Sequence, residues 1–422
     1  MQTAYKRTEL GGGVAISKIA DSKFKTNSVY VRFLTEYKRE DAAALALIPS
    51  VITSSSEDYP TGTLLNKKLN ALYGTTVTGS ASQIGGMYEV TVCIDYLSDV
   101  YALDGDKIAE PASQILLGCI FRPALENGGF AAAEFEMRRK DFLDSIDAEI
   151  NDKVSYALSE AFKTVYEGEP SASKHYGSRE EVESVTPQKA YEVYKKLLSE
   201  AKVEISLCGH GDFDEAEKLL SHAFDTARTS FADPRYFDYS AVKADTAYAE
   251  EKMDVSQANL VLAFKPKTHD LRVAQVMSCV YGGSTFSKLF ANVREKMSLC
   301  YFCQSIYSET KGTMFVVSAV EFDNIDKAKD EIIHQLSLIA NGEFTDDELA
   351  NAKLYLANAY SSSEDRISSI DLWYFRCNQR NEILTPQEYA EKLCEVTREQ
   401  VIQLAAQMKL DTVFVLRNIG EQ

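Results

Sequence analysis

The sequence predicts an α+β protein made of two tandem homologous halves, each a mostly antiparallel sheet packed with long helices. Three observations predict it. A capped helix followed by a buried strand occurs twice, a helix followed by a hairpin also occurs twice, and apolar residues make up 45% of the 422 residues. This length and composition are typical of a globular chain with more than one domain.

A helix followed by a hairpin occurs once in each half. The first copy has helix-like residues 64–72, strand-like residues 73–82, a Gly85-Gly86 turn and an alternating strand at 88–92. The second copy has helix-like residues 286–295, a strand at 300–307, a Lys311-Gly312 turn and a strand at 314–318. Two strands joined by a turn that contains glycine are typical of a hairpin.

Each half also contains a long helix and ends in a capped helix with a strand. Apolar residues recur at helical spacing over residues 130–165 and again over 345–365. Thr186 and Thr397 lie about half a chain length apart, and each can cap a helix that leads into a buried strand, at 203–208 and 412–416. Because different patterns repeat in the same order, we interpret the chain as a tandem duplication.

The join between the halves is expected near residues 226–245, where Pro234 breaks any helix. We therefore expect two domains, an N-terminal half at 1–228 and a C-terminal half at 229–422.

Charge and cysteine usage exclude several classes of protein. Acidic residues outnumber basic ones, 63 to 45, and no dense Lys/Arg run is present, so nucleic-acid binding is not expected. The sequence has no run of about 18 apolar residues, so a membrane span is not expected. The first residues also lack the apolar core of a signal peptide. Eight scattered cysteines, most of them in apolar runs, indicate reduced thiols and a cytoplasmic protein.

Catalytic motifs are missing from the sequence. Zinc hydrolases usually need three protein ligands, often two histidines on one helical face with a glutamate as base. Only five histidines are present, and the nearest pair, His210 and His222, is too far apart in sequence to share a helical turn. No nucleophile elbow or phosphate-binding loop is found. Cys300 and Cys303 form a C-x-x-C pattern in a predicted strand, where residues three apart face opposite sides, so we interpret them as core cysteines.

One segment resembles a known family. Its residues run from a Gly282-Gly283 turn through a helix that ends in Arg294-Glu295-Lys296 to Leu299-Cys300-Tyr301. This order is similar to the second-domain signature of the insulinase, pitrilysin and mitochondrial processing peptidase family, and the two-half layout fits the same family. The resemblance implies a processing-peptidase-like fold.

The same resemblance implies that the zinc site has been lost. The family carries its zinc motif on a first-half helix before a Tyr-Pro turn, here Tyr59-Pro60. Counting back places Ala46, Pro49 and Ser50 where the family has histidine, glutamate and histidine. Ile146 is the expected occupant of the third-ligand position. We therefore expect no metal, no cofactor and no catalytic residues in this chain alone.

In paired bacterial members of the family, one subunit carries the zinc motif and the other carries an arginine and a tyrosine. The resemblance assigns Arg294 and Tyr301 to substrate binding and implies a zinc-bearing partner subunit in a heterodimer, or a homodimer. A phenol can donate a hydrogen bond to an oxyanion, and a guanidinium can hold a carbonyl or carboxylate. Spacing alone favours Arg294 as a surface cation at a helix end, with Tyr301 at the core edge, and it is the family resemblance that favours the substrate-binding role.

The leading hypothesis is a catalytically incomplete peptidase homologue that binds peptide and completes a partner's active site. The family suggests the strand at 76–82 as the edge to which a peptide adds. One alternative is a purely structural or peptide-binding scaffold, like the core subunits of respiratory complexes. Another is a peptidase with an unrecognised metal site that includes His210 or His222.

Overall fold

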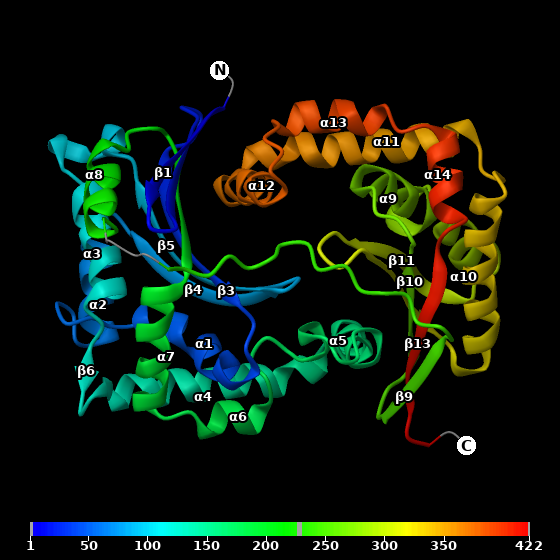
Figure 1. Cartoon of the computed structure of the whole chain (residues 1–422), viewed down its shortest axis with the longest axis horizontal. Coiled ribbons are helices and arrows are strands. Elements are labelled where there is room, and N and C mark those ends of the chain that lie inside the picture. Colours follow the sequence, from blue (N-terminus) through cyan, green and yellow to red (C-terminus); the bar gives the residue numbers. More distant parts are fainter. Residues whose placement is uncertain (1–2, 226–229, 421–422) are drawn as a thin grey trace. The chain divides into compact units, whose positions relative to one another are not determined.

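Two sheets with matching strand orders organise residues 3–225 and 230–420, which are the residues that this computed structural model describes (Figure 1). The first sheet has the order β1-β2-β8-β3-β5-β4, and its strands are β1 (Ala4–Gly11), β2 (Val14–Ala20), β3 (Thr26–Glu36), β4 (Thr76–Ile84), β5 (Met87–Leu97) and β8 (Lys202–Gly209). The second has the order β11-β12-β10-β13-β9, and its strands are β9 (Ala247–Met253), β10 (Ala258–Lys265), β11 (Cys300–Ser308), β12 (Thr313–Val320) and β13 (Lys409–Asn418).

The two sheets are copies of one topology. In each, a hairpin forms one edge: β4 pairs antiparallel with β5, and β11 pairs antiparallel with β12. In each, the last strand in sequence has one antiparallel and one parallel neighbour. Strand β8 pairs antiparallel with β3 and parallel with β2. Strand β13 pairs antiparallel with β10 and parallel with β9. This correspondence confirms the predicted α+β class and tandem halves, and it makes β4 and β11 equivalent edge strands.

The helices divide between two compact units. The first unit holds α1 (Arg39–Ile52), α2 (Gly62–Ala71), α3 (Ala109–Phe121), α4 (Ala132–Ala148), α6 (Arg179–Ser184), α7 (Pro187–Glu200) and α8 (Asp214–Ala223), with the short pieces η1 (Asp99–Tyr101), η2 (Leu103–Gly105), β6 (Leu125–Glu126) and β7 (Gly129–Phe130). The second holds α5 (Lys153–Val165), α9 (Leu271–Ser278), α10 (Ile325–Ala340), α11 (Asp346–Ser361), α13 (Pro386–Cys394) and α14 (Arg398–Ala405), with the short pieces η3 (Glu149–Asn151), η4 (Pro170–Ala172), η5 (Cys279–Gly283), η6 (Phe290–Lys296) and η7 (Phe322–Asn324). The short piece η8 (Ser362–Asp365) contains the boundary between the two units.

Each unit borrows a segment from the other half of the chain. The second unit contains residues Ala148–Ser173, which precede the rest of it in sequence, and the first unit contains residues Glu364–Arg376. Helix α12 (Ile367–Arg380) therefore begins in the first unit and ends in the second. The predicted boundary between residues 228 and 229 lies outside the described residues, and the division into 1–228 and 229–422 stays a prediction.

The core of the first unit lies on one face of its sheet. Val29, Val31 and Phe33 of β3 alternate with polar neighbours and pack, fully buried, with residues of α1, α3 and α7. The alternate residues of the same strand, among them Ser28 and Arg32, lie on the opposite face. That polar face is the one relevant to the site, because the segment 364–376 packs there through an Arg32–Asp371 ion pair.

The predicted caps and turns are confirmed. The Thr186 hydroxyl accepts a hydrogen bond from the Lys189 amide at 3.1 Å, and the Thr397 hydroxyl accepts one from the Gln400 amide at 3.2 Å. The turns at Gly85-Gly86 and Lys311-Gly312 join the expected hairpins.

The single long helix predicted over 130–165 is wrong. The chain breaks after α4, and Asp152 caps a new helix, α5, by accepting a hydrogen bond from the Ser155 amide at 3.1 Å. Apolar residues keep their helical spacing across the break, but those of α4 and those of α5 pack in different cores. Phe135 of α4 packs in the first unit, whereas Ala157 and Ala161 of α5 pack against the second sheet.

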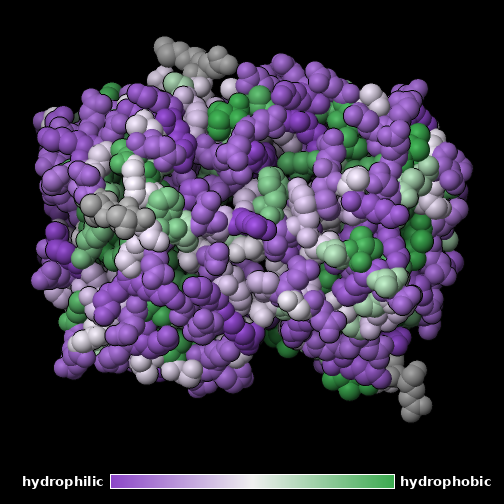
Figure 2. All heavy atoms as spheres, viewed as in Figure 1, coloured by the Kyte–Doolittle hydropathy of each residue, from purple (hydrophilic) through white to green (hydrophobic). Residues whose placement is uncertain are grey.

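Surface properties agree with the composition. The face shown in Figure 2 is mostly hydrophilic, with apolar side chains scattered over it. Within residues 3–225 and 230–420, no helix is long and apolar enough to cross a membrane.

Candidate functional site

The zinc-motif positions lie on α1, and none of them offers a free metal ligand. Ala46 and Pro49 are buried, and Ser50 is half-buried with its hydroxyl donating to the Leu47 carbonyl at 2.9 Å. Ile146, the expected occupant of the third-ligand position, lies on α4 and packs against the core. Imidazole and carboxylate, which would hold zinc, are therefore missing from all four positions.

Helix α1 also lies so close to strand β4 that a residue larger than glycine does not fit at position 79 without a shift. A Cβ atom added at Gly79 would lie 2.6 Å from the Pro49 carbonyl oxygen and 2.8 Å from the Pro49 Cβ. The place where the family motif would stand is thus filled by helix–strand packing. Among the residues that the structure describes, no group of three or more His, Cys, Asp and Glu side chains is placed to hold a metal ion. The residues at the zinc-motif positions therefore do not fit a zinc ion.

This packing gives a prediction. Gly79→Ala should destabilise the first unit by about 1–3 kcal/mol, because the new methyl overpacks against backbone that cannot move aside. The matched control is Gly62→Ala, where the added Cβ meets its nearest atom at 3.4 Å. Urea unfolding should separate the two variants, and equal midpoints would contradict the tight contact.

The two histidines of the alternative metal site do not share an element of secondary structure. His210 packs edge-to-face on Tyr101, and its Nδ1 lies 3.7 Å from Asp212 Oδ1. His222 lies in the last turn of α8. Neither belongs to a group of metal-ligand side chains within the described part of the chain.

Arg294 and Tyr301 are brought together. The Arg294 guanidinium carbon lies 5.9 Å from the Tyr301 ring centroid and 4.6 Å from that of Phe290. Arg294 is also paired with its neighbour Glu295, with Nε 3.5 Å from Oε1. The Tyr301 side chain is 77% exposed. The two aromatic rings hold the guanidinium at the surface, which leaves its remaining donors and the Tyr301 hydroxyl available to a ligand.

The backbone that carries this pair is irregular at three successive places. Arg294 lies in η6, a π-helical segment, and Ser298 has a left-handed φ of 50°. Tyr301 is the extra residue of a β-bulge, because Cys300 pairs with Val320 while Phe302 already pairs with Ala319. Such distortions each carry an energetic penalty, and they concentrate at functional sites, where they aim particular side chains.

A cavity missed by the sequence analysis lies beside the equivalent edge strand, β4. It has a volume of about 250 Å³ and is lined by Tyr30, Thr78, Gly79, Ser80, Thr91, Cys93 and Asp95. Ser28 donates to Asp95, and the Cys93 thiol lies 3.8 Å from the same carboxylate oxygen. Burial raises the pKa of the Tyr30 phenol, and nearby anionic groups raise it further, so this hydroxyl stays a neutral donor. The sequence signal that could have indicated this cavity is the alternation of hydroxyl residues at Thr76, Thr78 and Ser80.

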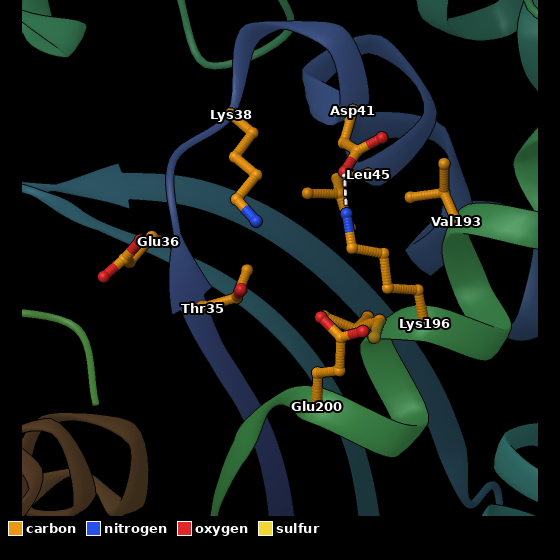
Figure 3. Close-up of a pocket in the computed structure, with 9 residues that line it drawn as sticks. Thr35, Glu36, Lys38, Asp41, Leu45, Val193, Lys196 and Glu200 are labelled. Atoms are coloured by element: carbon orange, nitrogen blue, oxygen red, sulfur yellow. Dashed lines mark hydrogen bonds and ion pairs between the residues drawn. The ribbon is translucent and has the colours of Figure 1, made fainter. Parts of the chain in front are cut away.

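A second hollow, between the end of β3, α1 and α7, is structural (Figure 3). Its volume of about 20 Å³ leaves room for roughly one water. Lys196 reaches across it to Asp41 at 2.9 Å and joins α7 to α1.

Comparison with known proteins shows which family this chain resembles. Residues 184–356, which include the Arg294–Tyr301 segment, match the family model described as "Peptidase M16 inactive domain". Over 96% of its length the chain is 24% identical to the "Probable inactive metalloprotease YmfF" of Bacillus subtilis strain 168, and the match covers 96% of that protein. The chain is therefore similar to M16-type peptidase homologues that are described as inactive.

Solved structures show the same fold. The chain superposes on a conserved protein from Enterococcus faecalis V583 with a TM-score of 0.92, at 24% identity and 99% coverage of both chains. It superposes on a "peptidase M16 inactive domain" from Pseudomonas fluorescens with a TM-score of 0.80, at 16% identity and 99% coverage of both. The processing-peptidase-like fold, expected from the signature at 282–301, is therefore confirmed, and the match at residues 184–356 supports the family resemblance.

Proposed function

We propose that this chain is the non-catalytic subunit of a two-chain M16 peptidase, and that it binds peptide and supplies Arg294 and Tyr301 to a zinc-bearing partner. One observation carries the proposal. Arg294 and Tyr301 lie together at an exposed sheet edge on distorted backbone, in a chain whose zinc-motif positions hold Ala46, Pro49 and Ser50.

The two side chains suit amide hydrolysis in different ways. Hydrolysis of an amide passes through an oxyanion, and the exposed Tyr301 hydroxyl can donate a hydrogen bond to it. Arg294 offers several planar donors for a peptide carbonyl or carboxylate. Stacking on Phe290 and Tyr301 limits the motion of the guanidinium, so less conformational entropy is lost when substrate binds.

Edge strand β4 is the proposed site of peptide addition. It pairs only with β5, so its outer backbone groups are available to an added strand. The cavity of about 250 Å³ begins at Thr78 and Ser80 of this strand and contains Asp95. We expect it to take one polar or basic side chain of the bound peptide.

The proposal includes a cytoplasmic heterodimer with zinc in the partner and none in this chain. The test is to purify this chain alone, together with an M16 chain that carries His-x-x-Glu-His and is encoded beside it, and that partner alone. Peptide cleavage should require both chains. Equal cleavage by the partner alone would reject the proposal and favour a scaffold role.

Within the active pair, Tyr301→Phe should lower kcat by about 10²-fold, the lower end for loss of one oxyanion donor, without weakening assembly. The matched control is Tyr248→Phe, which changes another exposed tyrosine on β9, at the opposite edge of the same sheet. Steady-state kinetics and analytical size-exclusion should be compared. An unchanged rate in Tyr301→Phe would remove this residue from the mechanism.

A further inference from the structure

Cys300 and Cys303 lie on the same side of strand β11, contrary to the interpretation from sequence. Cys300 pairs with Val320 and Cys303 pairs with Ser318, two residues away on β12. In a regular strand, residues three apart would pair three apart and face opposite sides. The bulge at Tyr301 adds one residue and reverses this alternation, so the two thiols are on one face.

The bulge also shortens the span between the two cysteines. Three regular strand residues would separate their Cα atoms by about 10 Å, whereas the two-residue step along β12 corresponds to about 6.8 Å. That value is at the upper end of the Cα separations found in disulfides. Because β11 is an edge strand, its outer side is not paired with another strand and can accommodate a small adjustment.

The two thiols differ in accessibility and acidity. Cys300 is half-buried, whereas the Cys303 side chain is buried. A hydrogen bond with Cys303 lowers the pKa of the Cys300 thiol to about 7. Burial raises this pKa, but the Cys303 hydrogen bond, helped by the Ser318 hydroxyl and the Arg294 charge, outweighs it. The same hydrogen bond, together with burial, raises the pKa of Cys303. An accessible thiolate beside a buried thiol is the arrangement of an attacking and a resolving cysteine.

The other cysteines do not share this environment. Burial raises the pKa of five of them, namely Cys93, Cys119, Cys208, Cys279 and Cys377. Cys394 is exposed and lies at the end of α13. It therefore serves as an internal reference for an accessible thiol.

We propose that Cys300 and Cys303 form a reversible dithiol–disulfide site that reacts with low-molecular-weight disulfides. The Cys300 thiolate attacks one sulfur of RSSR, forms a mixed disulfide and releases RS⁻. The Cys303 thiol gives its proton to a released RS⁻, and its sulfur attacks Cys300 Sγ and expels the second RS⁻, which takes up a proton from solvent. The protein loses two electrons, and RSSR is reduced to two RSH.

The closed ring would contain Tyr301 and fix the backbone that presents it. In the two-chain peptidase, oxidation should therefore lower turnover several-fold. This consequence rests on the proposed function, whereas the thiol chemistry does not, because it can be measured on the isolated chain.

The experiment exposes the reduced, isolated chain to oxidised glutathione, followed by alkylation and peptide mass spectrometry. We expect an intramolecular Cys300–Cys303 disulfide, formed at least about tenfold faster than glutathione adds to Cys394. Cys303→Ser should stop at a glutathione adduct on Cys300, and Cys394→Ser should behave like wild type. Circular dichroism checks that the Ser variants are folded.

Two results would overturn the proposal. One is a wild-type chain in which Cys300 reacts no faster than Cys394. The other is a stable glutathione adduct on Cys300 in the wild type, without transfer to Cys303. In the active pair, equal turnover before and after disulfide formation would show that the disulfide does not affect Tyr301. Absence of cleavage by the reduced pair would count only against the proposed function and not against the thiol chemistry.

Discussion

Asp411→Asn is expected to destabilise the second unit by about 3 kcal/mol, because it leaves the buried Lys265 ammonium group without its counter-charge. The Asp411 carboxylate is fully buried, 3.3 Å from Lys265 Nζ and 3.2 Å from Lys243 Nζ. Both lysines also donate to the Val165 carbonyl at 2.9 Å, at the C-terminus of α5. The cluster therefore binds the borrowed segment 148–173 to the second sheet.

The same cluster predicts a pH dependence. Burial raises the pKa of Asp411, but the Lys243 amide, the Thr412 hydroxyl and the two ammonium groups lower it further, so the net pKa lies below its usual value. A carboxyl with a depressed folded-state pKa stabilises the fold above its unfolded-state pKa of about 3.9. The contribution is lost as pH falls through the folded-state pKa. The difference in the free energy of unfolding between wild type and Asp411→Asn should thus be largest at pH 7 and decrease below about pH 3.9.

Denaturant unfolding followed by circular dichroism, with hydrogen exchange of α5, should measure both effects. Amides of residues 153–165 should exchange faster in the variant. Asp346→Asn is the matched control, because Asp346 pairs with Arg398 but is 95% exposed, and it should change stability by less than about 1 kcal/mol. Adding Lys265→Met to Asp411→Asn should recover part of the loss, since it removes the fully buried unpaired charge. No recovery would indicate that Lys243 carries the effect.

Sequence reasoning succeeded where structure is decided by near neighbours. The caps at Thr186 and Thr397 and the two glycine-containing turns depend on residues within a few positions, and all four are confirmed. The repeated order of these local signals was enough to infer two copies of one topology.

It failed where distant contacts decide. Apolar periodicity continues from α4 into α5, and spacing alone cannot show that the two helices serve different cores. The interpretation of Cys300 and Cys303 assumed regular alternation, which one bulge reverses. Arg32 and Asp371 are 339 positions apart in sequence, so no local pattern could pair them. The placement of Arg294 beside Tyr301 came from the family signature, because spacing alone favoured a surface role.

Asp371→Asn is expected to destabilise the first unit by about 3 kcal/mol and to release the segment 364–376 from its sheet. Asp371 is buried and forms a two-pronged pair with Arg32, in which Nη1 lies 3.4 Å from Oδ1. Burial lowers the pKa of Arg32, but the carboxylates of Asp371 and Glu89 raise it above its usual value, so this arginine stays charged. Glu89 alone, at 3.3 Å from Nε, cannot satisfy the outer nitrogens.

The sole tryptophan reports directly on this segment. Trp373 is buried two positions from Asp371, so its fluorescence should shift toward longer wavelength in Asp371→Asn at denaturant concentrations where circular dichroism is still native. The matched control in the same unit is Asp233→Asn, because Asp233 pairs with Lys202 at 3.4 Å but is 82% exposed. Coincident fluorescence and circular dichroism transitions in Asp371→Asn would mean that the segment unfolds only with its sheet. Since Asp411 holds the segment 148–173 in the second unit, wild-type fluorescence in Asp411→Asn would show that the two borrowed segments are fixed independently.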